Sequence, residues 1–416
     1  MKRIIKISLI VIAAIVLILA GVIGVAYLKQ GHKIQPRIYM TDLNLSAEER
    51  EADFLEISEM LEKENSFVIR RMDFSALCRD YLPKVKQTSN SIDYGKLLVR
   101  FFAELNNGHT SALFNRYKAN CWATIIDGRI FVESIRNESL NAGGLAPKDE
   151  IVAINDIPVD RWITEELPYI EASTPEYRMK RLSYNVFAGY TDTIRTYKIR
   201  NESGEKEVVL PMYKEIPSDT DTLNVWGKML TDSVAYVAIE SMNGNHIFPQ
   251  FQRVYRTLKN ASHIIIDIRK NGGGNSGTSE KIAQYFIRQS QKACVSGNEL
   301  KPVADAFLGK VYLLIGNDTF SAAESFALDM KESGNTILIG EQTGGDTGNR
   351  PIEFQTSHGI VFRIPSRETV QRSFQGFPME GKGIQPHFQV HQTAEDYLLE
   401  KDVVLDYALS RVNALD

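Results

Sequence analysis

The sequence predicts an α/β core that follows a helical region and a compact, mostly β module. Three observations predict this order. Residues 44–108 carry apolar side chains at helical spacing, residues from about 120 to 215 fall into short β-like runs, and the rest alternates strand-like and helix-like segments. Strands that alternate with helices indicate a sheet with parallel strand pairs. A length of 416 residues fits two to three domains of about 100–200 residues each.

Composition and charge narrow the classes of function. The chain is 43% apolar and 24% charged, which is ordinary for a globular protein and excludes a wholly disordered one. The net charge is −4, and setting aside three basic residues before the first apolar run leaves −7 on the remainder (Lys2, Arg3, Lys6). An acidic body argues against nucleic acid as a partner.

The cysteines indicate neither a disulfide framework nor a zinc site. Cys78, Cys121 and Cys294 are few and scattered, and none of them has the paired spacing of zinc ligands. At most one disulfide is compatible with them. Nothing else in the sequence implies a metal or an organic cofactor, so we expect neither.

The first 28 residues predict a membrane anchor. Residues 7–28 are almost wholly apolar and would span roughly 30 Å as a helix, enough to cross a bilayer. The short basic head should stay in the cytoplasm, which leaves the rest of the chain outside it. The alternative is export after cleavage of a signal peptide, although the only small-residue site is the weak one at residues 24–26. No cysteine ends this run, so a lipid-anchored lipoprotein is not expected.

A linker at residues 29–43 and a helical region at residues 44–117 come next. Ser46 and Glu49 form a capping box before apolar residues at helical spacing. A second helix should start at Asp73 and stop before Pro83. A third should end at residues 106–108, which places His109 directly after a helix end.

The β module and the core follow at residues 118–215 and 216–392. The module has one helix-like stretch at 161–170 and strand-like runs at 123–126, 129–134, 150–155, 193–199 and 207–210. The core has helix-like stretches at 277–288 and 322–331, and strand-like runs at 234–240, 263–269, 311–316, 337–340 and 360–365. Residues 393–416 should form short C-terminal helices.

The first candidate for chemistry is the run of glycines that ends the strand at 263–269. Glycines at a strand–helix junction let the backbone turn tightly and present N–H groups to an anion, which the helix start also favours. The phosphate-loop signature Gly-Lys-Ser/Thr is absent here, so an oxyanion fits better than a nucleotide phosphate. The alternative is a tight turn without further function.

The second candidate is Ser321, which stands between a strand and a helix. Such a junction exposes a serine Oγ beside backbone N–H groups, as in a nucleophile elbow. Ser321 and Glu324 also have capping-box spacing, so the serine could be only a helix cap. A nucleophile needs a base, and His109 is the histidine that a loop can bring to a cleft, unless a desolvated lysine serves instead. Glu380, in a glycine-rich loop, could orient the base or be merely solvated.

Five segments, in this order, resemble the tail-specific (carboxy-terminal processing) proteases and the tricorn core protease, a family of serine peptidases. They are residues 107–110, 265–274, 319–324, 339–345 and 380–386. The resemblance covers roughly residues 95–392 and is greatest to exported or membrane-attached members from Bacteroidetes-like bacteria. It implies that the core has the crotonase-like and Clp-protease-like βαβ sheet.

The β module resembles the PDZ segment that precedes the core in this family. The likeness lies in residues 144–159, where Asn155-Asp156 stands in place of the family's Asn-Gly. In the family this domain receives polypeptide ends or gates the site, with an exposed sheet edge for strand addition. We therefore expect a PDZ-like domain, the alternative being a purely structural module.

The resemblance also implies a set of catalytic residues. In the tricorn-like arrangement Ser321 is the nucleophile, His109 the base and Glu380, 59 positions after the serine, the third member. The family's other arrangement, a Ser–Lys dyad, needs a lysine in the loop at 344–348, which has none. A serine usually precedes the histidine and links it to the glutamate. Gly108 stands at that position in this chain. Glu380 would then be coupled to His109 directly, through a water or through another hydroxyl.

The remaining site residues follow from the same resemblance. N–H groups of Ala322 and of Gly273 or Gly274 are expected to hold the oxyanion, and residues 343–345 to bind substrate (Thr343, Gly344, Gly345). Together with the anchor at residues 1–28, these roles predict a membrane-anchored, extracytoplasmic (periplasmic) serine endopeptidase that acts on polypeptides. It could recognise these substrates by their C-terminal tails. Two alternatives are a catalytically inactive peptide-binding scaffold and a crotonase-like acyl-transfer enzyme. The second would need a coenzyme A site, and no basic nucleotide pocket stands out.

Overall fold

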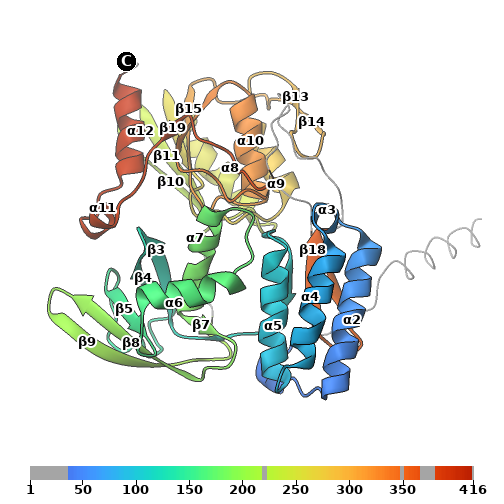
Figure 1. Cartoon of the computed structure of the whole chain (residues 1–416). Coiled ribbons are helices and arrows are strands. Elements are labelled where there is room, and N and C mark those ends of the chain that lie inside the picture. Colours follow the sequence, from blue (N-terminus) through green and yellow to red (C-terminus); the bar gives the residue numbers. More distant parts are fainter. Residues whose placement is uncertain (1–35, 218–222, 347–350, 366–379, 415–416) are drawn as a thin grey trace, which may run out of the picture.

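A computed structural model describes residues 36–217, 223–346, 351–365 and 380–414. The elements form a helical region, a β module and an α/β core, which can be followed by colour in Figure 1. The predicted anchor lies outside the described residues. In the described ranges, no helix combines the length and the apolar character needed to span a bilayer.

The helical region packs its helices over a small sheet. Its elements are η1 (Met40–Asp42), α2 (Ala47–Glu64), α3 (Phe67–Arg70), α4 (Phe74–Lys86), α5 (Ser91–Glu104) and β1 (Ser111–Leu113). The predicted capping box is confirmed, because the Ser46 side chain accepts from the Glu49 N–H and Glu49 accepts from the Ser46 N–H. Phe54, Phe101 and Phe102 fill the core between the helices.

Three predictions about this region are wrong. The second helix does not stop before Pro83 but continues through it to Lys86. Residues 36–43 are not a free linker, because Met40 is fully buried in the helical core. The strand at 360–365 does not join the α/β sheet. It forms β18 (Val361–Pro365), which pairs with β1 and with β17 (Pro351–Gln355). The apolar residues of β18 are buried against the helices of this region, and the Phe362 ring lies 5.5 Å from that of Phe102 on α5.

The β module is an antiparallel sheet with the strand order β3-β4-β5-β8-β9. Its elements are β2 (Tyr117–Lys118), β3 (Cys121–Ile126), β4 (Arg129–Ile135), β5 (Glu150–Ile154), β6 (Ile157–Pro158), α6 (Val159–Glu166), η2 (Leu167–Tyr169), α7 (Pro175–Val186), β7 (Ala188–Gly189), β8 (Ile194–Asn201) and β9 (Gly204–Pro211). All five predicted strands are present. The helix α7, capped by Thr174, was not predicted because polar residues dominate its sequence.

The core is a six-stranded sheet with the strand order β10-β11-β12-β15-β16-β19. Five of these strands run parallel to one another, and the edge strand β10 is antiparallel to β11. Its strands are β10 (Val225–Met229), β11 (Val234–Ile239), β12 (His263–Asp267), β15 (Lys310–Ile315), β16 (Thr336–Gly340) and β19 (Phe388–Gln389), and a hairpin of β13 (Gln291–Lys292) and β14 (Glu299–Leu300) lies apart. Helices α8 (Ile247–Leu258), α9 (Ser276–Ala283) and α10 (Ala322–Glu332) cover one face, and α12 (Val403–Asn413), after α11 (Ala394–Leu398), covers the other (Figure 1). The predicted α/β core is confirmed.

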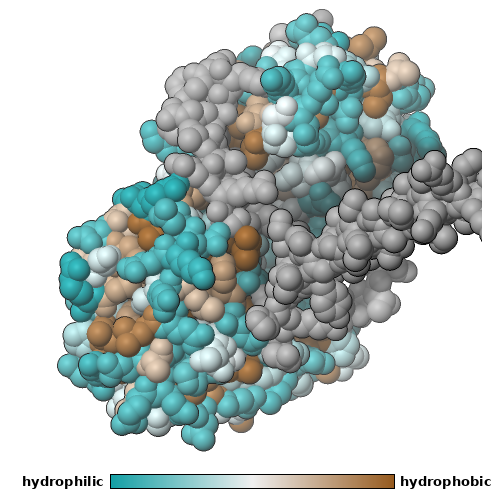
Figure 2. Space-filling view, turned by 90° about the vertical axis from the view of Figure 1, so that its right-hand side faces the viewer, coloured by the Kyte–Doolittle hydropathy of each residue, from teal (hydrophilic) through white to brown (hydrophobic). Residues whose placement is uncertain are grey.

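This topology brings the two candidate loops together. Strands β12 and β15 are parallel neighbours, and Asp267 at the end of β12 is in register with Leu314 near the end of β15. Their carboxyl ends therefore share one edge, and the glycine loop and the serine loop both leave from it. The described surface on the side seen in Figure 2 is mainly hydrophilic, with apolar residues in small separate patches.

Candidate active site

Ser321 stands at the start of α10 in a strained conformation. Its φ of 57° and ψ of −119° are unusual for a residue other than glycine. The preceding loop is fixed to the end of β12, because the Phe320 N–H donates to Asn271 O (3.1 Å) and Thr319 Oγ1 donates to Ile268 O (2.9 Å). A strained serine at a strand–turn–helix junction is the geometry of a nucleophile elbow.

The glycine loop after β12 touches the serine directly. Gly273 has a φ of +96°, and a Cβ there would lie 2.6 Å from Phe320 O and 2.8 Å from Ser321 Cβ, so only glycine fits. Its N–H already donates to Asn271 Oδ1 (2.9 Å). Within the described ranges the N–H groups of Gly274 and Ala322 have no acceptor. Of the predicted oxyanion donors, these two are available.

His109 reaches Ser321 from the loop after α5. Its Nε2 lies 3.0 Å from Ser321 Oγ, so the structure brings two side chains 212 positions apart into hydrogen-bond distance. The imidazole is buried and packs against the Phe320 ring, with centroids 4.8 Å apart. This contact holds the ring in place beside the serine.

The carboxylate at the other imidazole nitrogen is Asp346 and not the predicted Glu380. Asp346 Oδ1 lies 2.9 Å from His109 Nδ1. Glu380 stands one side chain further away: the Asn107 amide donates to Asp346 Oδ2 and to Glu380 Oε1, both at 2.8 Å. Among the described residues, Asn107 and Asp346 thus stand between Glu380 and His109, so the direct link that the sequence allowed is wrong.

Charge divides unequally between the two buried carboxyl groups. Burial alone would raise the pKa of Asp346, but the charge and hydrogen bond of His109 lower it below its ordinary value. Burial, with the nearby negative charge of Asp346, raises the pKa of Glu380 to about 9. At neutral pH Asp346 is therefore the ionised partner of His109, and Glu380 is protonated.

Position 108 is occupied by glycine for a steric reason that the sequence does not reveal. A Cβ at this position would lie 2.7 Å from Phe320 Cζ and 3.2 Å from Tyr177 Cε1. The serine that the family resemblance leads one to expect does not fit there. A hydroxyl comes instead from Ser173, which donates to Asp346 Oδ2 (3.2 Å) and accepts from the Gly108 N–H (3.0 Å).

Residues 343–345, which were predicted to bind substrate, form hydrogen bonds with other parts of the protein. Thr343 is fully buried and donates to Glu324, the Gly344 N–H donates to Thr319 O, and the Gly345 N–H donates to Glu324. These contacts fix the loop that connects β16 to Asp346. A substrate-binding role of Thr343, Gly344 and Gly345 stays a prediction.

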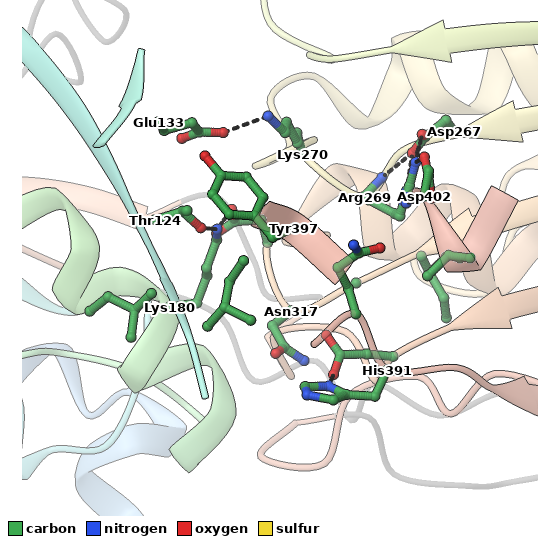
Figure 3. Close-up of a pocket in the computed structure, with 18 of the residues that line it drawn as sticks. Thr124, Glu133, Lys180, Asp267, Arg269, Lys270, Asn317, His391, Tyr397 and Asp402 are labelled. Carbon is green, nitrogen blue, oxygen red and sulfur yellow. Dashed lines mark hydrogen bonds and ion pairs between the residues drawn. The ribbon is translucent and has the colours of Figure 1, made fainter. Parts of the chain in front are cut away.

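A cavity of about 980 Å³ lies between the β module, the core and the C-terminal segment. Figure 3 shows its charged lining, in which Lys270 pairs with Glu133 (2.5 Å) and Arg269 pairs with Asp267 and Asp402. It reaches the serine loop at Asn317 and Asp318, and Lys180 of α7 pairs with Asp318 (3.3 Å). These cavity lysines are thus engaged with carboxylates, and the group on Ser321 Oγ is an imidazole.

Known families match two parts of the chain. Residues 233–390 match the model of peptidase family S41, and residues 125–212 match that of the N-terminal domain of Bacteroidetes S41-family peptidases. The chain belongs to peptidase family S41. The second match covers most of the β module, whose PDZ-like character stays a prediction.

Relatives of this S41-family chain are distant in sequence. It is 26% identical to the tricorn protease of Thermoplasma acidophilum over 184 residues, 42% of this chain and 16% of that protein. It is 23% identical to the carboxy-terminal processing protease CtpB of Bacillus subtilis over 229 residues, 53% of this chain and 44% of that protein. The chain thus spans less than half the length of these two relatives. The structure of mature CPAF complexed with lactacystin has the same fold, with a TM-score of 0.71 at 12% identity over 88% of this chain and 99% of that one.

Sequence reasoning missed the roles of four polar residues around the S41-family site, namely Asn107, Ser173, Glu324 and Asp346. Of these, Glu324 had been considered only as part of a helix cap. Asn107 and Glu324 lie within motifs that carried the resemblance, yet neither received a role beyond the helix cap. Asp346 occupies the loop where the Ser–Lys arrangement has its lysine, and a charged residue there was a usable signal. Nothing near Ser173 in the sequence pointed to the site.

Proposed function

We propose that this chain is a serine endopeptidase that hydrolyses polypeptides, with Ser321 as nucleophile, His109 as general base and Asp346 as the carboxylate that orients the base. One observation carries the proposal. A strained serine Oγ lies 3.0 Å from an imidazole whose other nitrogen lies 2.9 Å from a buried carboxylate. A nucleophile that contacts a base, which in turn contacts an orienting carboxylate, is the arrangement that activates serine for acyl transfer.

The reaction follows from these contacts. His109 Nε2 takes the proton of Ser321 as Oγ attacks the peptide carbonyl, and the negative oxygen is held by the free N–H groups of Ala322 and Gly274. The protonated His109 then gives its proton to the leaving amine as the C–N bond breaks. Water attacks the resulting ester with His109 again as base, which releases the acid and restores Ser321. Loss of one oxyanion donor typically costs about 10²–10³ in rate.

A fluorophosphonate probe tests the nucleophile and a quenched polypeptide substrate tests the turnover. We expect the parent to react with the probe, Ser321→Ala not to react, and His109→Ala to lose turnover. Equal labelling of the parent and of Ser321→Ala would exclude Ser321. A folded parent that binds peptides but neither reacts nor cleaves would instead favour the catalytically inactive peptide-binding scaffold.

We also propose that C-terminal tails of polypeptides reach the β module. The support is that β3 is an edge strand with α7 beside it, and that both line the cavity next to the serine loop. Cleavage of matched substrates with free and amidated C-termini tests this. Equal rates would speak against tail recognition.

The location is a proposal from the sequence alone. We propose that residues 1–28 hold the protein in the cell membrane with the remaining chain outside the cytoplasm, the alternative being export after cleavage. Alkaline extraction and N-terminal sequencing of the full chain distinguish the two. Release into the soluble fraction with an intact N-terminus would contradict both.

A further inference from the structure

Glu324, the third residue of α10, has a fully buried carboxylate that accepts four hydrogen bonds. Its Oε2 accepts from the Ser321 N–H (3.1 Å) and from the Asp346 N–H (2.9 Å). Its Oε1 accepts from Thr343 Oγ1 (2.5 Å) and from the Gly345 N–H (2.8 Å). A single oxygen atom thus holds the backbone of the nucleophile and the backbone of the orienting carboxylate.

We propose that Glu324 is a positioning residue that fixes Ser321 and Asp346 relative to each other, so that His109 can meet both. The inference rests on the proposed function. It goes beyond a helix cap, because a cap serves only the first turn of α10, whereas three of the four donors lie in residues 343–346 on a different element. Without Glu324, the loop that carries Asp346 would lose its anchor on the helix that carries Ser321.

Four donors on one carboxyl group require the ionised form. An ionised carboxylate accepts at both oxygens, whereas a protonated acid or an amide turns hydrogen toward at least one of these donors. Burial makes the ionised form expensive and raises the pKa of Glu324 to about 7 despite the four hydrogen bonds. A group retained at a cost to stability is typical of a functional site.

The same helix offers a matched control. Asp329 is also buried on α10, and burial likewise raises its pKa to about 7. Its carboxylate, however, accepts from the Cys294 N–H (2.7 Å), which belongs neither to the serine loop nor to residues 343–346. Replacing Asp329 by asparagine therefore imposes a similar change on the helix and leaves the Ser321–Asp346 link intact.

The experiment compares the parent, Glu324→Gln and Asp329→Asn for fluorophosphonate labelling, kcat, KM and Tm. We expect Glu324→Gln to lower kcat and the labelling rate by about 10²-fold, the typical effect of a small misplacement of reacting groups, with KM close to parental. Asp329→Asn should keep parental rates. Equal rates in Glu324→Gln and Asp329→Asn, after correction for the folded fraction, would overturn the inference. A parent that never labels would instead overturn the proposed function.

A second pair of variants serves if Glu324→Gln does not fold. Thr343→Val removes the hydroxyl that donates to Glu324, and Thr343→Ser keeps it. We expect Thr343→Val to lose kcat and Thr343→Ser to regain most of it. Parental kcat in Thr343→Val would show that the hydrogen bonds of Glu324 do not position the site.

Discussion

Replacing Gly108 by alanine should destabilise the protein and disturb the site at once. The new Cβ would lie 2.7 Å from Phe320 Cζ, about 0.7 Å inside the shortest ordinary contact of 3.4 Å. The Phe320 ring has little room to retreat, because it is flanked by the rings of Tyr177 (4.4 Å) and His109 (4.8 Å). Overpacking of a closed core costs about 1–3 kcal/mol, and two rigid neighbours place this case at about 2–3 kcal/mol.

Urea unfolding measures this loss, with Gly272→Ala as the control because a Cβ there meets nothing within 4 Å. Labelling of Ser321 should slow in Gly108→Ala, since the displaced Phe320 ring carries both the His109 contact and the serine loop. The double variant Gly108→Ala/Phe320→Leu should recover part of the stability, which a double-mutant cycle would report as a coupling energy. A Gly108→Ala protein as stable as the parent would refute the steric reasoning.

Three further outcomes follow from the hydrogen bonds of Asp346. Asp346→Asn should lower kcat by about 10³–10⁴-fold in single-turnover assays, because an amide no longer stabilises the imidazolium, and a loss below tenfold would argue against its role. Ser173→Ala should cost about 1–3 kcal/mol in urea unfolding, because it leaves the Gly108 N–H without its acceptor and removes one of the hydrogen bonds that Asp346 accepts, and parental stability would count against this hydroxyl. Glu380→Gln should flatten the pH dependence of stability: with a folded-state pKa of about 9 against an ordinary 4.5, Glu380 makes the unfolding free energy fall as pH rises through that interval, and an unchanged slope would contradict the assignment.

The nucleophile and base could be predicted because each lies beside a local signal. Ser321 follows a buried strand and opens a helix, and His109 follows a helix end, so both positions have a structural meaning within a few residues. Asp346 has no such setting. It comes to His109 only because β16 is the parallel neighbour of β15 and its following loop returns to the same sheet edge. Pairing between distant segments, and not local pattern, decides that contact.

The same limit explains the errors in the fold. Alternating apolar residues correctly identified β18 as a strand, but they do not say which sheet it joins, and the helical core offered the better cover for Phe362. The helix α7 was missed because its polar surface hid the few apolar side chains that it buries, such as Tyr177 and Leu182. Periodicity predicts an element where one face is clearly apolar, and it fails for a helix such as α7, in which few apolar side chains stand among many polar ones.

The division of charge between Asp346 and Glu380 explains why the glutamate matched by spacing is not the partner of the histidine. Both carboxyl groups share the Asn107 amide in a buried site, so their ionisation together would be costly. His109 lies against Asp346 and stabilises its negative charge, and that charge in turn keeps the proton on Glu380. The charge that orients the base therefore belongs to the loop after β16, and that loop is fixed through Glu324 to the helix that carries Ser321.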